Sequence, residues 1–326
     1  MIECIAPQVQ RLSLVLAAQH SPLLGTPLEP ILEPRRIQAP PGYHSTKCIS
    51  TGLFLLIAQG RIKHDLGEEP VPTEITAHSI AYQVIRHGLQ VFFVREDFAR
   101  AVAATDLPHD FTLDDLHWPM PGMVVAWPAG FMQEVVGRDI CYVYAANLDA
   151  GDYSVSAMPG CPTITIPTAK VGWHYYAWDG QHLESFVTAF HRDNPVDKAI
   201  LRYGYTDYTG IRDEAGVEAD KAMTDQVSAL MLKLLVVLNT RPNLVERGQC
   251  VRPQRIKHGR VKHRELWSPN LIGWQYRVAG ETPSSTHASP RLHWRRGHVR
   301  HQPFGAGRTQ RRLVWIEPML IGAAKM

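Results

Sequence analysis

The most regular pattern of apolar positions in the chain lies between residues 216 and 238. The first half of this stretch is acidic and amphipathic, and residues 227–238 are apolar at every position except Ser228 and Lys233. A helix that is apolar on all sides is buried inside a protein core. Asn239 and Pro242 follow the stretch, and both residue types are typical of helix ends. The pattern therefore predicts one central buried helix.

Short runs of β-branched and aromatic residues predict several strands. Residues 73–87 and 96–104 fit helices, and residues 182–191 fit either a strand or a helix. The regular alternation of strand and helix that marks a doubly wound sheet is missing. We therefore expect an α+β fold with a mixed or antiparallel, strand-rich body. The predicted strands span residues 51–58, 89–94, 123–127, 140–145, 163–166, 171–178 and 313–316.

Composition divides the chain into three parts. Residues 1–48 combine a predicted amphipathic helix at 7–19 with six prolines between residues 22 and 41, which predict an extended linker. Residues 49–246 form the predicted acidic α+β body. Residues 247–326 form a basic, strand-rich C-terminal segment, which either folds by itself or packs into the same domain.

Charge is distributed unevenly between the body and the C-terminal segment. The whole chain contains 34 Lys and Arg and 31 Asp and Glu, which gives a formal net charge of only +3. Residues 247–326 hold 16 of these bases and only three of the acids, whereas residues 1–246 hold 18 bases and 28 acids. A segment with such an excess of positive charge points to a polyanionic partner.

The positive charges fall in two runs that aromatic residues interrupt. Guanidinium groups bind phosphate through paired donors, and aromatic rings stack on bases, so the two runs favour an RNA or single-stranded DNA surface. The alternatives are a solvated surface, an interface with the acidic body and a protein partner. The candidate nucleic-acid-binding residues are Arg255, Lys257, Arg260, Lys262, Arg264, Arg291, Arg295, Arg296, Arg308, Arg311 and Arg312.

The second basic run repeats an Arg-x-His-x-Arg pattern at residues 291–295 and 296–300, offset by one position. In an extended chain the two sets of side chains lie on opposite faces. A β-bulge at Arg296 and Gly297 would bring both sets to the same side, because glycine tolerates the bulged conformation. The pattern thus predicts either two basic faces or, with a bulge, one.

Histidines in this run suggest RNA cleavage without a metal ion. The reaction needs a base, an acid and cations that stabilise the charged phosphorane. The same residues would serve plain phosphate binding equally well. No metal or cofactor is expected, because no Cys-x-x-Cys pair accompanies the histidines and the surrounding cations would repel a metal ion. The candidate catalytic residues are His293, His298, His301, Arg300 and Glu317.

Three features of the body look structural. Thr112 precedes Asp114 and Asp115, which predicts a turn capped by the threonine. His174 lies between two aromatic residues in a predicted strand and is expected to be a buried histidine. Cys141 is expected to be a small core residue.

The stretch from Arg296 to Arg308 reads RGHVRHQPFGAGR, and Val-Trp-Ile-Glu-Pro follows at residues 314–318. This tail resembles that of uncharacterised bacterial and mobile-element open reading frames, and residues 267–276 are part of the same resemblance. The resemblance covers about the last fifth of the chain. It implies a role connected with a phage, a plasmid or bacterial defence, and it implies no fold, activity or catalytic residue.

Five scattered cysteines without a Cys-x-x-Cys pair are typical of reduced thiols in the cytoplasm. No uninterrupted apolar run reaches the ~18–20 residues of a membrane span, so we expect a cytoplasmic protein without a membrane partner. The sequence therefore predicts a nucleic-acid-binding protein, with RNA slightly favoured, whose enzymatic version is a metal-independent endoribonuclease of toxin or defence type. The alternative is a non-enzymatic adaptor or inhibitor that binds a protein or nucleoprotein partner.

Overall fold

The fold was analysed in a computed structural model of the chain. It describes residues 39–44, 90–108, 110–118, 120–149, 151–154, 163–166, 170–178, 183–191, 214–248, 250–251, 266–267, 269–277, 279–280 and 293–321. The elements predicted at residues 7–19, 51–58 and 73–87 lie outside these ranges, as does most of the proline-rich stretch.

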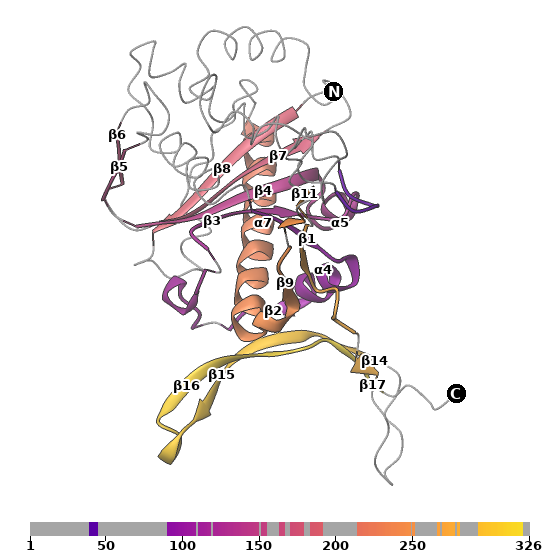
Figure 1. Ribbon diagram of the computed structural model, residues 1–326, viewed down its shortest axis with the longest axis vertical. Coiled ribbons are helices and arrows are strands. Elements are labelled where there is room, and N and C mark those ends of the chain that lie inside the picture. The colour runs from indigo at the N-terminus through magenta and orange to yellow at the C-terminus, as the bar shows by residue number, and fades with distance from the viewer. Residues whose placement is uncertain are drawn as a thin grey trace, which may run out of the picture.

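A seven-stranded mixed sheet forms the centre of the fold (Figure 1). The three strands β3, β1 and β12 run parallel to one another, and all the other neighbours in the sheet pair antiparallel. Every residue of β1 and β3 is buried, which is typical of parallel strands covered on both faces. The strand order is β8 (Leu183–His191), β7 (Lys170–Trp178), β4 (Asp139–Leu148), β3 (Gly122–Ala126), β1 (Val91–Val94), β12 (Asn270–Ile272) and β9 (Val245–Glu246).

Three helices pack together beside this sheet. The long helix α7 (Glu214–Thr240) contacts both α4 (Glu96–Ala103) and α5 (Phe131–Val136). In Figure 1, α7 runs behind the strands along the long axis of the molecule. Glu96 and Asp97 stand in the first turn of α4, where negative charge suits the helix dipole.

Helix α7 is the central buried helix that the apolar pattern predicts. Its two buried hydroxyl groups bind aromatic side chains of β7: the Trp173 Nε1 donates to the Ser228 Oγ at 3.0 Å, and the Tyr175 and Thr224 hydroxyls lie 2.8 Å apart. By length and composition alone residues 221–240 would suffice to span a membrane, although charged and polar residues interrupt the apolar run. The fold buries 67% of the most apolar window, as expected for a core helix.

The C-terminal segment contributes to the central sheet and also builds smaller ones. Strand β12 lies between β1 and β9 in the central sheet. Short ladders join β5 (Gly151–Ser154) to β6 (Thr163–Ile166) and β10 (Cys250–Val251) to β11 (Leu266–Trp267). The other strands form two three-stranded sheets. Their orders are β13 (Ala279–Gly280), β17 (Met319–Ile321), β14 (His293–Arg295), and β16 (Gln310–Ile316), β15 (Gly297–Phe304), β2 (Thr105–Asp106).

Three aromatic rings join the tail to the body. The ring centre of Phe98 in α4 lies 5.5 Å from that of Tyr276 and 5.9 Å from that of Trp315, and the Tyr276 and Trp315 rings lie 5.9 Å apart. Tyr276 follows β12, and Trp315 belongs to β16. The two stretches that share the sequence resemblance, residues 267–276 and 296–318, therefore meet on α4.

The local predictions agree closely with the structure where it describes them. The predicted helix at 96–104 and the predicted strands from 89 to 178 and at 313–316 are confirmed, and the ambiguous residues 182–191 form β8. The backbone N–H and the hydroxyl of Thr112 both donate to the Asp115 carboxylate at the short helix η2 (Leu113–Asp115), which is the predicted cap. Cys141 and His174 are buried, also as predicted.

Of the two arrangements that the sequence left open, the structure has the one without a β-bulge at Arg296 and Gly297. Arg295 pairs with Met319 and His298 pairs with Ile316, so two residues on each strand separate these pairs. A bulge adds a residue to one strand only. Gly297 is needed for close approach instead, because a Cβ atom there would lie 2.8 Å from the Thr105 Oγ1 and 2.8 Å from the Pro318 Cδ.

Candidate functional site: an arginine-rich hairpin

Residues 297–316 form a two-stranded hairpin that contains four arginines and no acid, and we call it the arginine hairpin. In Figure 1 it is the yellow ribbon that passes α7 and extends beyond the body. The short helix η4 (Ala306–Arg308) forms its tip, and β15 and β16 pair in register along its length. Because residues opposite each other place their side chains on the same face, the hairpin has two distinct faces.

The inner face of the arginine hairpin is anchored in the core. Val299 and its cross-strand partner Trp315 are 3% and 4% exposed. The Trp315 Nε1 donates to the Thr105 Oγ1 at 3.1 Å, and the Thr105 hydroxyl donates to the Ala101 carbonyl at 2.8 Å. These contacts hold the root of the hairpin in a fixed position against α4.

His301 also lies on the inner face, where it contacts two carboxylates. Its Nδ1 is 3.0 Å from the Asp110 Oδ1, and its Nε2 is 3.6 Å from the Asp115 Oδ1. The His301 side chain is 15% exposed, whereas that of Asp110 is 70% exposed. The histidine therefore tethers the middle of the hairpin to the η2 region.

The outer face presents cations beside an exposed ring. Arg300 and Arg312 point to this face and are exposed. Phe304 shares the face and is 37% exposed. Among the described residues it is the one large hydrophobic side chain that is exposed to solvent. The Arg312 guanidinium carbon lies 5.4 Å from the centre of the Phe304 ring, in a cation–π contact. Exposed Arg and aromatic residues of this kind are the types that dominate binding energy at protein interfaces.

The tip of the hairpin is built from left-handed backbone. Gly305 and Gly307 have φ angles of 78° and 65°, and Arg308 has a φ of 54°. Arg308 is the only described non-glycine residue with a positive φ, which costs about 1–2 kcal/mol. Residues held in such conformations cluster at functional sites. The tip therefore holds an exposed arginine in a conformation that a glycine would adopt more easily.

The predicted catalytic residues do not form one cluster. His298 and Arg300 share the outer face, and His301 lies on the inner face. The Glu317 Oε1 is 2.6 Å from the Arg241 Nη1, so this carboxylate pairs with the body. The His293 side chain is outside the described part. RNA cleavage needs an acid and a base that reach the same phosphate, and the described side chains of the hairpin do not provide such a pair. The described residues also contain no group of three His, Cys, Asp or Glu placed to hold a metal ion.

Part of the predicted nucleic-acid-binding set gathers on and beside the hairpin. The described members are exposed, and none of them forms an ion pair with another described residue. They are Arg308, Arg311 and Arg312 in the hairpin, and Arg295 and Arg296 at its root. The others, Arg255, Lys257, Arg260, Lys262, Arg264 and Arg291, lie outside the described residues.

Sequence reasoning missed the residues that position the hairpin. Thr105, Asp110 and the tethering role of Asp115 carry no local signal, because their partners lie about two hundred residues further along the chain. Lys233 did carry a signal, as a single cation within an apolar helix. It lines a cavity close to the hairpin root.

Comparison with known proteins identifies the family. A family model described as AcrVA2-like, the anti-CRISPR type V subtype A2 family, matches residues 92–323. The match spans the central sheet, α7 and the whole arginine hairpin. No curated protein and no solved structure matches the chain. The match supports the resemblance to mobile-element proteins in general, although it does not concern the tail motif by itself. Since it covers more than two thirds of the sequence, the chain belongs to the AcrVA2-like anti-CRISPR family.

Proposed function

We propose that this protein is a non-enzymatic inhibitor of a type V CRISPR system, and that it binds a protein or nucleoprotein component through the arginine hairpin. The family match over residues 92–323 carries this proposal. It favours the inhibitor over the endoribonuclease that the sequence also suggested. The separation of His298 from His301 on opposite faces agrees with that preference. We place the action in the cytoplasm, where CRISPR effectors meet invading nucleic acid.

The chemistry of the hairpin suggests an anionic partner surface. CRISPR effectors carry a guide RNA, and arginine binds phosphate with two parallel hydrogen bonds. Because no described carboxylate pairs with Arg300, Arg308, Arg311 or Arg312, an anionic partner can reach these arginines without breaking an ion pair.

An interference assay in bacteria tests the function. Cells that carry a type V system and a matching target plasmid should lose the plasmid, and expression of this protein should restore plasmid survival. The double substitution Arg308→Ala and Arg311→Ala should remove most of the protection. The substitutions Lys221→Ala and Arg138→Ala, which also remove two positive charges, should retain it. Plasmid loss that the wild-type protein does not reduce would refute the proposal.

RNA binding through the hairpin remains a prediction with its own test. If all four hairpin arginines contact phosphates of single-stranded RNA, the logarithm of affinity should fall with the logarithm of salt with a slope of about −3. Removing Arg311 and Arg312 should reduce this slope by about half. Fluorescence anisotropy with labelled RNA measures both slopes. Protection in cells without RNA binding at low salt would identify the partner surface as protein.

A further inference from the structure

A cavity of about 600 Å³ lies between α4, α5, α7 and the root of the arginine hairpin. Cavities of this size are typical of small-ligand sites. Part of its wall is apolar, formed by Phe131, Val135 and alanines of α4. Six charged side chains complete the wall: Asp97, Arg100, Asp106, Glu134, Lys233 and Arg296. The cavity is distinct from the outer face of the hairpin, so an inference about it does not depend on the proposed function.

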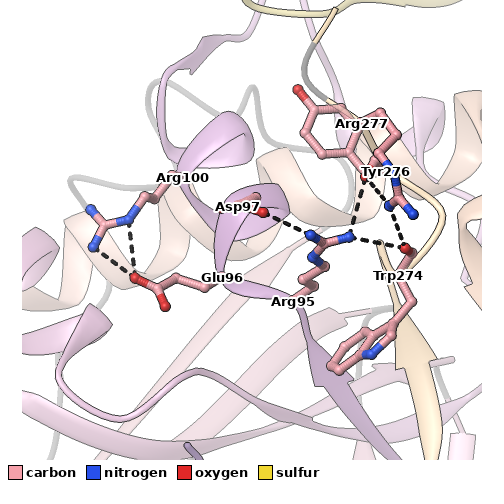
Figure 2. Close-up of polar contacts among 7 residues, drawn as sticks. All are labelled: Arg95, Glu96, Asp97, Arg100, Trp274, Tyr276 and Arg277. Carbon is pink, nitrogen blue, oxygen red and sulfur yellow. Dashed lines mark hydrogen bonds and ion pairs between the residues drawn. The ribbon is translucent and has the colours of Figure 1, made fainter.

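Several of these charges are already paired. Arg100 donates to Glu134 from both terminal guanidinium nitrogens, at 2.7 and 2.9 Å, and its Nη2 also contacts the Glu96 Oε1 at 3.1 Å. Asp97 accepts a hydrogen bond of 2.9 Å from the Arg95 Nη2. Figure 2 shows the pairs Arg100–Glu96 and Arg95–Asp97 side by side on α4. Arg100, Glu134 and Asp97 therefore all have ion-pair partners.

Lys233, Arg296 and Asp106 remain, and none of the three forms an ion pair with another described residue. The half-buried Lys233 donates one hydrogen bond, to the Ala103 carbonyl at 3.1 Å, although an ammonium group has three donors. Arg296 is exposed and forms no hydrogen bond with another described residue. Burial lowers the pKa of Lys233. The negative charge of Asp106 raises this pKa, and the positive charge of Arg296 lowers it further. Two cations with unused donors thus face the same cavity.

The wall beside these cations is held rigidly. The Arg95 Nη1 donates to the carbonyls of Trp274 and Tyr276, at 3.1 and 3.4 Å, and the Arg277 Nη1 donates to the same two carbonyls (Figure 2). Tyr276 borders the cavity, and burial raises its pKa to about 12. Its buried hydroxyl has no hydrogen-bond partner in the described structure and points away from the Arg95 guanidinium in Figure 2.

We propose that this cavity binds a ligand with a carboxylate group and an apolar body, whose carboxylate is held by Lys233 and Arg296 and whose body packs against Phe131 and the α4 alanines. A carboxylate brings two acceptor oxygens, one for each of the two cations with unused donors. A phosphate carries nearly two negative charges, so the Asp106 carboxylate in the same wall repels it more strongly than it repels a carboxylate. The carboxylate can belong to a free organic acid or to an acidic side chain of a polypeptide, since the recognised chemistry is the same.

Calorimetric titration of the full-length protein tests this site. The probes are 3-phenylpropionate, its uncharged analogue 3-phenylpropanamide, N-acetyl-glutamate N-methylamide and inorganic phosphate. At least one of the two carboxylates should bind, 3-phenylpropionate at least tenfold more tightly than the amide and either carboxylate more tightly than phosphate. Lys233→Met should weaken carboxylate binding at least tenfold, and Lys221→Met, on an exposed part of the same helix, should leave it unchanged. Tighter binding of the glutamate probe would indicate a polypeptide side chain, and tighter binding of phenylpropionate a free acid.

Three results would overturn the proposal: no binding of either carboxylate, equal affinity for phenylpropionate and its amide, or phosphate as the tightest ligand. Because Lys233 is half-buried, Arg296→Met is the second variant. Arg296 is exposed, so the substitution should preserve the melting temperature while weakening carboxylate binding at least tenfold. Undiminished binding by a folded Arg296→Met protein would also refute the site.

Discussion

Gly273 is the position where the described structure leaves least room for a side chain. Its φ is +82°, and a Cβ atom would lie 2.4 Å from both the Cβ and the Cγ of Phe98. Phe98 is 0% exposed and packs against Tyr276 and Trp315. Because the clash is with the base of the ring rather than with its far end, rotation of the ring cannot relieve it. Gly273→Ala should therefore move α4 away from the turn that follows β12.

The expected cost combines two terms. A left-handed alanine costs about 1–2 kcal/mol, less about 0.4–1 kcal/mol for the stiffer unfolded chain. Overpacking of a close-packed core adds about 1–3 kcal/mol, and the upper end applies here because the neighbouring atoms are buried. Gly273→Ala should thus lower the free energy of unfolding by about 3–4 kcal/mol.

Gly130→Ala provides the matched control. Gly130 has a φ of +79° and no atom within 4 Å of an added Cβ, so only the conformational term applies and the cost should be about 1 kcal/mol. Urea unfolding followed by tryptophan fluorescence measures both variants. The difference between them isolates the contact with Phe98. Equal destabilisation by the two substitutions would refute the close approach of β12 to α4.

Three further predictions follow from single residues. Burial lowers the pKa of His174 to about 3, below its ordinary 6.5, so the unfolded chain takes up the proton first. The stability should therefore fall by about 1.4 kcal/mol for each pH unit between pH 6 and pH 4, and His174→Leu should flatten this slope in pH-dependent urea melts. Hydrogen bonding to His44 lowers the pKa of Asp139 against the effect of burial, so its contribution is present above pH 4 and disappears as the pH falls through the lower folded value. Asp139→Asn should lower the melting temperature at pH 7 more than at pH 3. Arg308→Gly removes the positive-φ penalty and should slow hydrogen exchange in the arginine hairpin, while the lost charge weakens inhibition in cells. Faster exchange in that variant would show that the tip is not strained.

The elements that the sequence predicts correctly are those with a strong local pattern. Helix α7 is predicted from a long stretch that is apolar at nearly every position. The antiparallel strands β4 and β7 contain enough aromatic and β-branched residues for each strand to be predicted from its own sequence. These patterns depend on neighbours in the sequence. They establish that an element exists and what type it is, and they leave its partners open.

The parallel centre of the sheet could not be predicted, because its strands come from distant parts of the chain. β12 has only three residues, Asn270–Ile272, and pairs with β1 almost 180 positions earlier. The Asn270 side chain, which donates to the Val91 carbonyl at 2.9 Å, helps to fix this pairing. A run of three residues carries no periodic signal, so neither the strand nor its register is visible in the sequence.

Only part of the candidate site could be predicted from the sequence, for a related reason. Alternation within one strand correctly places His298 and Arg300 on the same face. The same alternation puts His301 on the opposite face. Only the fold shows that Asp110 and Asp115 contact His301 on that face. Composition identifies which side chains can bind phosphate. It does not show which of them the body has already engaged.

The contacts between the body and the tail argue that the hairpin cations are kept for an external partner. Among the described residues, ionisable side chains make two sets of contacts near the hairpin: Glu317 pairs with Arg241 at 2.6 Å, and His301 contacts both Asp110 and Asp115. In the first, the tail supplies the acid and the body supplies the arginine, which is the reverse of what neutralisation of a basic tail would require. In the second, the tail supplies a histidine, and the arginines of the hairpin take part in neither. Anchoring through these contacts fixes the position of the hairpin and leaves its arginines unpaired within the described structure. An anionic partner therefore meets a rigid cationic surface whose own ion pairs do not have to be broken, which lowers the cost of binding.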